Sequence, residues 1–487
     1  FEGAIQFRLH AGDTAARRFA YGEADEHYEW ASRWVEKLPP ASRPGVVLEL
    51  HRKRGTVLHA QRRSDEAAQH FEVMLAKARE AGSAEAERAA LTGLCDAIVY
   101  SAQRTDEVAG YAEELLDAAS RTGDASHIAE ARGRLGEALV TEGRFTEAIP
   151  LLNDVIATAR SCEAPTALLI GLGHRGIVHY MQAEYEMAEA CLVEMEALAA
   201  DRGDGFHVLL SRLFSGLSMA LQGHVSRALG ELEETSVMAR QNGDHFTLPR
   251  IVSHLGWVRA ELFALDEARE FWLESLRLAP ESPTAAFPAV EPLMYLCVDD
   301  VRIGNPAGAA ASLAKLERAF RGSRSHRSWS ALRLEKAAAR HWEARGDWER
   351  AAEHAGRVLP IAERLGAREY RCVAERICAE AALERGEDLK ESARRLAEAL
   401  EALCRFRVPF ETWKAARLLG LLRRRLGDEP RARRAFGESA RAIRIIAAGV
   451  TDEGLRAGFL SATPVREVLE AAPGEGEAPP PAPIDPS

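Results

Sequence analysis

The sequence has few of the features that mark membrane proteins or disulfide-stapled proteins. No uninterrupted apolar run approaches the roughly 18 residues that a membrane-spanning helix needs. The 7 cysteines are odd in number and scattered, with no C-x-x-C pair, which favours reduced thiols and a cytoplasmic location over a disulfide framework or a zinc site. A net charge of -11 argues against general nucleic-acid binding. The chain begins with Phe1 instead of Met, which indicates a piece of a longer protein.

Motifs of common catalytic sites are also missing. There is no G-x-x-x-x-G-K-[ST] phosphate loop, no G-x-S-x-G elbow and no H-E-x-x-H pair. His174 and His179 are five residues apart, which is poor spacing for joint metal ligation on a helix, and the adjacent Asp299 and Asp300 point to different helix faces. The sequence therefore predicts no enzyme activity, no cofactor and no metal site for this chain.

What the 487 residues do contain is one short pattern, repeated. A small residue is followed twelve positions later by alanine and four positions after that by a bulky apolar residue. The strongest copies are Gly12/Ala24/Tyr28, Gly55/Ala67/Phe71, Gly136/Ala148/Leu152, Gly176/Ala188/Leu192, Gly216/Ala228/Leu232, Gly256/Ala268/Trp272 and Gly420/Ala432/Phe436. With four weaker copies, the middle position recurs eleven times at intervals of 40 to 43 residues.

The glycines of this pattern indicate close packing between helices. Glycine inside a helix costs about 1 kcal/mol relative to alanine, so its recurrence at one phase requires a recurring benefit. We expect the glycine of one helix to meet the alanine of its partner, with the bulky residue filling the seam beside them. A further glycine series falls between the two positions (Gly143, Gly223, Gly304, Gly346, Gly386, Gly427), and another closes the second helix (Gly82, Gly123, Gly203, Gly243, Gly366).

Each unit is thus predicted to be two helices of roughly 16 residues joined by a short turn, with no β-alternation. The pattern resembles the tetratricopeptide repeat family, with a period of about 40 in place of 34. The resemblance implies an all-α, right-handed α-α superhelix of about eleven helix-turn-helix repeats. Residues 8–24 and 452–469 resemble the start and the close of the regulatory arms of large bacterial signalling ATPases, which are often linked to a kinase or cyclase.

Prolines and composition suggest where the array is interrupted. Repeats 1–7 occupy residues 1–279, a proline-rich junction follows at 280–292, and repeats 8–11 occupy 293–450. Pro360 is expected to kink or shorten a second helix. Thr451 and Thr463 are expected to begin two capping helices within 451–472, and the tail at 473–487 is too rich in proline, glycine and glutamate to form a core.

The phase of the repeat predicts which side chains face the concave surface. In early repeats these are polar, and include Glu49, Arg52, Thr56, His59, Glu130, Glu137 and Thr141. In later repeats they run from apolar to basic, and the candidate partner-binding residues are Tyr180, Met181, Leu217, Leu221, Trp257, Met294, Arg333, Arg340, Arg417 and Arg424. The alternative is that longer helices bury these residues between repeats, which would leave no open apolar strip.

Charge divides unevenly along the chain. Residues 321–446 hold 29 Lys and Arg against 19 Asp and Glu, so this part could dock an acidic partner or an upstream domain of the same polypeptide. Few aromatic residues stand among these arginines to stack on bases, which makes nucleic acid a poor ligand. We therefore expect a non-enzymatic solenoid that binds a protein, peptide or effector, as a regulatory arm of a larger signalling protein. The alternative is a freestanding scaffold.

Overall fold

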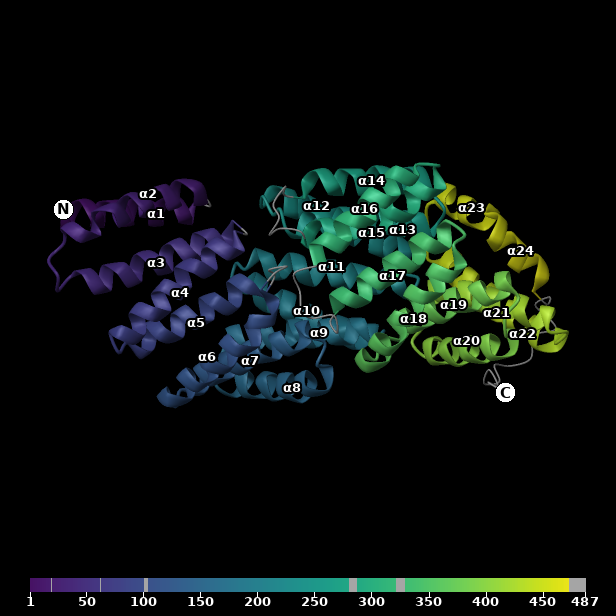
Figure 1. Ribbon diagram of the computed structural model, residues 1–487, viewed down its shortest axis with the longest axis horizontal. Coiled ribbons are helices and arrows are strands. Elements are labelled where there is room, and N and C mark those ends of the chain that lie inside the picture. The colour runs from purple at the N-terminus through teal and green to yellow at the C-terminus, as the bar shows by residue number, and fades with distance from the viewer. Residues whose placement is uncertain (19, 62, 100–103, 280–286, 321–328, 473–487) are drawn as a thin grey trace. The chain divides into compact units, whose positions relative to one another are not determined.

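The computed structural model describes residues 1–18, 20–61, 63–99, 104–279, 287–320 and 329–472, and these are almost entirely helical (Figure 1). They form twenty-four α-helices and two short 3₁₀ helices, and no strand occurs within these ranges. The predicted all-α, tetratricopeptide-like solenoid is confirmed.

Eleven antiparallel hairpins account for the first twenty-two helices, which matches the eleven predicted repeats. The hairpins are α1(Glu2–Arg17)/α2(Tyr21–Trp34), α3(Arg43–Ala60)/α4(Ser64–Glu80), α5(Ala84–Ile98)/α6(Val108–Thr122), α7(Ala125–Thr141)/α8(Phe145–Ser161), α9(Pro165–Met181)/α10(Tyr185–Asp201), α11(Gly205–Leu221)/α12(Val225–Gln241), α13(Thr247–Glu261)/α14(Leu265–Leu278), α15(Phe287–Arg302)/α16(Pro306–Phe320), α17(Trp329–Ala344)/α18(Trp348–Leu365), α19(Arg368–Arg385)/α20(Leu389–Cys404) and α21(Pro409–Arg425)/α22(Glu429–Ala448). Two shorter helices follow, α23(Glu453–Ser461) and α24(Thr463–Ala471).

Each repeating glycine packs against the bulky side chain of the second helix. A Cβ placed on Gly136 would lie 2.6 Å from Leu152, and one placed on Gly256 would lie 2.7 Å from Trp272. The alanine between them is fully buried, as Ala148 shows. The predicted close approach therefore exists, but the main contact of the glycine is the bulky residue sixteen positions later, because that side chain lies across the helix where a Cβ would stand.

The turns between helices share one backbone conformation from repeat to repeat. All eleven glycines that the sequence places in the two turn series have positive φ, between 63° and 87°. Positions of the same phase that lack glycine keep this conformation: Glu163 stands one repeat after Gly123 with φ 52°, and Phe263 stands one repeat after Gly223 with φ 63°. The repeat thus imposes the left-handed conformation on residues that disfavour it.

A polar pair joins the two helices of five repeats at one fixed position. The spacing of the partners is constant, and it is one longer in the repeat that carries one extra residue. The pairs are Arg8–His27 at 2.9 Å, His51–His70 at 2.9 Å, Arg212–Glu231 at 2.5 Å, Glu335–His354 at 2.7 Å and Glu375–Arg395 at 3.0 Å. Burial, with Arg54 and His51 nearby, lowers the pKa of His70 to about 4, so this imidazole is neutral at pH 7.

The chain packs as two compact units that divide within α9 and not at the proline-rich junction. Unit 1 is built on Phe1–Gly171, and unit 2 on the described parts of 172–280, 288–320 and 325–487. Of the junction, 280–286 lie outside the described residues, as does the tail at 473–487, while α15 already begins at Phe287. Pro360 does not shorten its helix, because α18 continues to Leu365.

The first capping helix begins one residue later than predicted. Asp452, not Thr451, caps α23 and accepts a hydrogen bond from the Leu455 N–H at 2.8 Å. Thr451 instead hydrogen-bonds the hydroxyl of Ser226, which lies far back in the sequence at the start of α12. The side chain that the local pattern assigned to the helix cap therefore makes a tertiary hydrogen bond instead.

Candidate functional site

The inner face of unit 2 is formed by the C-terminal part of α9 and by α11, α13, α15, α17, α19 and α21, and it is largely filled by its own side chains. Of the predicted binding residues, Met181, Leu217, Leu221 and Arg333 are buried, Tyr180, Trp257, Met294, Arg340 and Arg417 are half-buried, and Arg424 is exposed. The ring of Tyr180 lies 5.1 Å from that of Phe214, and the ring of Trp257 lies 6.1 Å from that of Phe410. The apolar residues thus pack on one another.

Unit 2 closes on itself because turns of early repeats contact late repeats. Gln182, in the turn before α10, donates to the Leu365 carbonyl at 3.3 Å, and Arg368 donates to the Gln182 carbonyl. One repeat later, a Cβ on Gly223 would lie 3.0 Å from Pro409. These partners belong to repeats that are far apart in the sequence, so the closure is tertiary.

The third contact of this seam is aromatic. Phe263, in the turn before α14, places its ring 6.4 Å from Trp413 and 6.3 Å from Phe459. Beside it, Glu261 accepts from Lys414 at 2.5 Å. Three successive turns therefore hold α18–α23, and we call this set of contacts the seam of unit 2.

Buried ion pairs cross the interior of unit 2. The carboxylate of Glu291 accepts from Arg250 at 3.3 Å and from Arg333 at 2.8 Å, and all three side chains are at most 8% exposed. Burial acts to raise the pKa of Glu291, but the charges of Arg333 and Arg250 outweigh it and hold this pKa below its usual range. The group is ionised at neutral pH and stabilises the two arginines.

Several cations predicted on the inner face of the late repeats are paired with carboxylates of the same chain. Arg376 contacts Glu343 at 2.8 Å and Glu411 at 2.9 Å, and Arg417 contacts Glu467 at 2.9 Å. Lys336 lies 3.8 Å from Glu369, Arg340 lies 2.8 Å from Glu343, and Arg424 lies 3.6 Å from Glu429. The sequence showed the cations but not which carboxylates would pair with them.

One pocket of unit 2, of about 490 Å³, lies at the seam. It is lined by Glu186, Glu189, Gln222, His224, Cys404, Arg407, Val408, Pro409, Thr412, Glu438, Ala442 and Ile445. Burial raises the pKa of its Cys404 thiol to about 12, with Glu438 adding to the effect, so this thiol is protonated at neutral pH.

The inner face of unit 1 differs, since its polar residues are accessible. Arg52 and Thr56, one turn apart on α3, are both exposed. A pocket of about 290 Å³ lies between α3 and α5, and it is lined by Arg52, Thr56, His59, Phe71, Arg88, Ala89, Thr92, Gly93 and Asp96. The repeat phase predicts the α3 members of this pocket on the concave face. It does not predict Arg88 and Thr92, because they stand eight and four residues before Asp96, at phases that were not expected to face inward.

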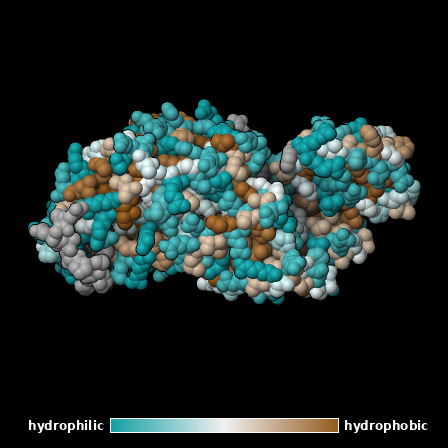
Figure 2. Space-filling view, turned by 180° about the vertical axis from the view of Figure 1, so that it is seen from behind, coloured by the Kyte–Doolittle hydropathy of each residue, from teal (hydrophilic) through white to brown (hydrophobic). Residues whose placement is uncertain are grey.

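Other candidate chemistry is limited in the described parts of the chain. His179 is buried and hydrogen-bonded to Glu184 at 2.7 Å. No three His, Cys, Asp or Glu side chains gather as a metal site in these parts, and none of their helices is long and apolar enough to cross a bilayer. All seven cysteines are free thiols. On the face drawn in Figure 2, apolar residues form small separate groups among hydrophilic ones.

Among the comparisons with known proteins, only the one with solved structures finds similar chains. No protein family's sequence model matches the chain, and no characterised protein is similar enough in sequence to count as a relative. The crystal structure of a Rap protein complexed with Competence and Sporulation Factor is 14% identical over 83% of this chain and 99% of its own, with a TM-score of 0.48. The Rap conjugation gene regulator of the plasmid pLS20, in complex with the Phr* peptide, is 11% identical over 72% and 98%, with a TM-score of 0.47. Yeast Tom70 is 13% identical over 96% and 99%, with a TM-score of 0.34.

Proposed function

We propose that this chain is a non-enzymatic interaction solenoid that holds an extended segment of a partner protein on the inner face of unit 1. The observation that carries the proposal is the contrast between the two inner faces. That of unit 2 is packed, and cations on it such as Arg333 and Arg376 are ion-paired within the chain, while that of unit 1 keeps accessible polar side chains and a pocket between neighbouring repeats. An extended segment fits such a face because successive first helices offer regularly spaced contacts.

Binding on unit 1 would act through repeat geometry. Each repeat contacts mainly its neighbours, so a segment that joins α3 to α5 constrains the angle between two hairpins, and the constraint passes along the stack. In unit 2, Tyr180 and Trp257 would become available to a partner only if the seam opened. We therefore place recognition in unit 1 and assign unit 2 to a conformational role.

We further propose that the chain is the regulatory arm of a larger signalling ATPase in the cytoplasm. The segments at 8–24 and 452–469, which resemble the ends of such arms, fall in the first hairpin and in α23–α24. The free thiols suit a reducing compartment. A phosphate-loop ATPase encoded in the reading frame before Phe1 is the expected finding. A start codon close to Phe1 with no such domain would favour the freestanding scaffold.

The binding face is tested with peptides selected on the purified chain from a display library of random segments, then synthesised and remeasured by fluorescence anisotropy. Thr56→Trp places a large ring on the inner face of α3, in the wall of the pocket, and should weaken binding about tenfold or more. The matched control is Val73→Trp on α4, where the parent side chain is exposed at 40%.

A variant of unit 2 separates the two inner faces. Tyr180→Ala combined with Trp257→Ala should leave peptide affinity unchanged within twofold when the variant remains folded by circular dichroism. Loss of binding in this variant together with full binding by Thr56→Trp would place recognition in unit 2 and contradict the proposal.

A further inference from the structure

We propose that the pocket between α3 and α5 is a binding site for a phosphate monoester dianion, gripped by Arg52 and Arg88. The inference rests on the proposed function in that the pocket lies on the face assigned to the partner, and it names the chemical group that this face would recognise. A phosphorylated side chain of a partner segment and a small phosphorylated metabolite share this chemistry.

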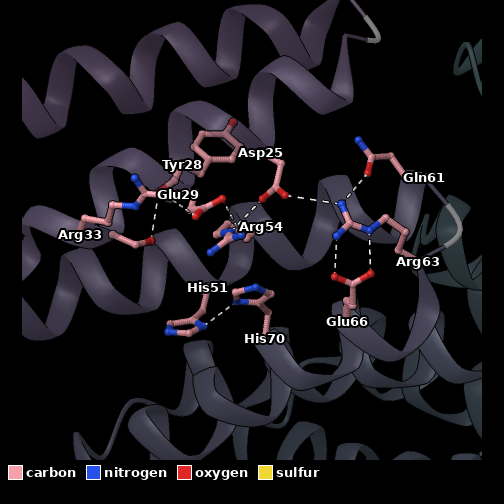
Figure 3. Close-up of polar contacts among 11 residues, drawn as sticks. Asp25, Tyr28, Glu29, Arg33, His51, Arg54, Gln61, Arg63, Glu66 and His70 are labelled. Atoms are coloured by element: carbon pink, nitrogen blue, oxygen red, sulfur yellow. Dashed lines mark hydrogen bonds and ion pairs between the residues drawn. The ribbon is translucent and has the colours of Figure 1, made fainter.

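The two arginines stand out because neighbouring cations are already paired. On α3, Lys53 contacts Asp13 at 2.5 Å and Arg54 contacts Asp25 at 2.8 Å. Figure 3 shows Arg54 directed at Asp25 and Glu29, and Arg63 bonded to Glu66. Arg52, on the same helix, makes no ion pair or hydrogen bond through its side chain to any described residue.

The carboxylate nearest to Arg88 in the sequence of α5 is also paired with other arginines. The preceding residue, Glu87, accepts from Arg79 at 3.1 Å and from Arg121 at 2.8 Å, but not from Arg88. Among the residues that the structure describes, the Arg88 side chain likewise has no acidic partner. The carboxylate in the pocket wall, Asp96, contacts Arg134 at 2.6 Å, and Arg134 also contacts Glu137 at 2.9 Å. The lining therefore holds two arginines without a partner among the described residues against one carboxylate that is already paired.

Hydrogen-bond capacity supports an oxyanion ligand. The Thr92 hydroxyl is buried and makes no hydrogen bond within the described ranges, so it can donate to a ligand oxygen. Two guanidinium forks add several donors whose planar geometry suits phosphate oxygens. The donors outnumber what a single carboxylate can accept, and two unpaired cations match a dianion better than a monoanion.

The shape of the pocket is fixed by a buried ring. Phe71 lies between α3 and α5, where a Cβ on Gly55 would come within 2.7 Å of it and one on Gly93 would clash with it. The ring is 4% exposed, so it forms a rigid wall and not a stacking surface. With about 30 Å³ per atom-sized site, a pocket of about 290 Å³ holds roughly ten non-hydrogen atoms, which suits a phosphoserine side chain or phenyl phosphate.

Calorimetric titration of the purified chain with phenyl phosphate and with O-phosphoserine tests the assignment. Arg52→Gln combined with Arg88→Gln should weaken binding about tenfold or more, because charge-assisted hydrogen bonds to the ligand are lost. The matched control removes the same charge outside the pocket, with Arg33→Gln and Arg121→Gln, and should stay within about twofold. If the glutamine variant does not fold, Arg52→Lys with Arg88→Lys keeps the charge and should give an intermediate loss.

The dependence of affinity on pH and on the type of anion tests whether the bound ligand is a dianion. Since the second ionisation of a phosphate monoester falls near pH 6, affinity should rise between pH 5.5 and 7.5. Benzoate should bind at least about tenfold more weakly than phenyl phosphate at pH 7.5. Equal binding of benzoate, equal losses in the pocket variant and its matched control, or no binding of either phosphate probe would each overturn the assignment.

Phosphopeptides with a central phosphoserine distinguish the sources of the ligand and the two proposals. Tighter binding than free O-phosphoserine, lost in the Thr56→Trp variant, supports a partner segment. Phosphopeptides no tighter than free O-phosphoserine would support a small metabolite and count against the proposed function alone. Selected peptides that bind the inner face without competing with phenyl phosphate would support the proposed function. They would also show that the phosphate site takes no part in that function, which would overturn the inference.

Discussion

The buried carboxylate of Glu291 gives the sharpest test of how unit 2 is held together. Glu291→Gln removes the charge between Arg250 and Arg333, whose side chains are 8% and 6% exposed. Removing one partner of a buried pair leaves uncompensated charge and typically costs about 3–5 kcal/mol. Because glutamine keeps one hydrogen-bonding oxygen, we expect a loss of about 3 kcal/mol in the free energy of unfolding of unit 2. For a body of this size that corresponds to a fall of roughly 5 °C in the melting temperature.

A second variant separates the cost of an orphaned charge from the value of the pair. Replacing all three members, as Arg250→Met, Glu291→Leu and Arg333→Met, removes the charges together. Such replacement of buried ion pairs is often neutral or stabilising. We expect this variant to unfold within about 1 kcal/mol of the parent chain, clearly above the Glu291→Gln variant. Urea unfolding followed by circular dichroism in the far ultraviolet measures both.

The pH dependence has a definite sign. The pKa of Glu291 is lower folded than unfolded, so its contribution to stability is present above the unfolded pKa of about 4.3 and is lost as pH falls through the folded pKa. The parent chain should therefore lose stability between about pH 5 and pH 3 more steeply than the Glu291→Gln variant. Equal midpoints for the two chains at pH 7, with parallel acid profiles, would refute the assigned role of this ion pair.

Five further substitutions test the glycine contacts, the turns and the seam. Gly256→Ala should destabilise the chain by about 1–3 kcal/mol, since its Cβ would lie 2.8 Å from a backbone oxygen. Gly356→Ala, where no atom lies within 4 Å, should instead stabilise by up to about 1 kcal/mol, and thermal melts compare the two. Glu163→Gly should raise stability by about 0.5 kcal/mol by relieving a left-handed backbone at φ 52°, and a lower melting temperature would show that this backbone is not strained. Lys414→Glu should increase hydrogen exchange at the seam. Combining it with Glu261→Lys should recover about 1 kcal/mol or more, and purely additive effects would mean that the pair at 2.5 Å does not stabilise the seam.

Much of the hairpin geometry follows from local chemistry. The Gly, Ala and bulky-residue pattern indicated eleven hairpins, and each is present. A glycine that meets a side chain sixteen positions later, as Gly136 meets Leu152, involves one hairpin only, so one repeat contains both partners. The same holds for the polar pair between Glu375 and Arg395, whose longer spacing reflects the extra residue of its repeat.

The candidate site was only half predictable for a related reason. The phase of α3 predicts Arg52 on the concave side, and Arg52 lines the pocket between α3 and α5. Whether Arg52 can bind a ligand depends on which neighbouring cations pair with the nearby carboxylates. Contacts between hairpins, such as that of Arg54 with Asp25, decide this pairing. Arg333 was also predicted to face inward, on a later helix, and it is buried against Glu291, which lies on α15 in the preceding repeat. Two arginines predicted to face inward thus differ in accessibility.

The sequence alone determined the period, the hairpin, the turn conformations and the direction in which each side chain leaves its helix, because these depend on interactions within a single hairpin. Only the tertiary structure decided that α9–α14 meet α18–α23, since that seam depends on small angles between hairpins which accumulate along the stack. A small change of angle in each repeat would leave every local rule satisfied and the interior of unit 2 open. The division of labour between a closed inner face and an accessible one is therefore a property of the folded array.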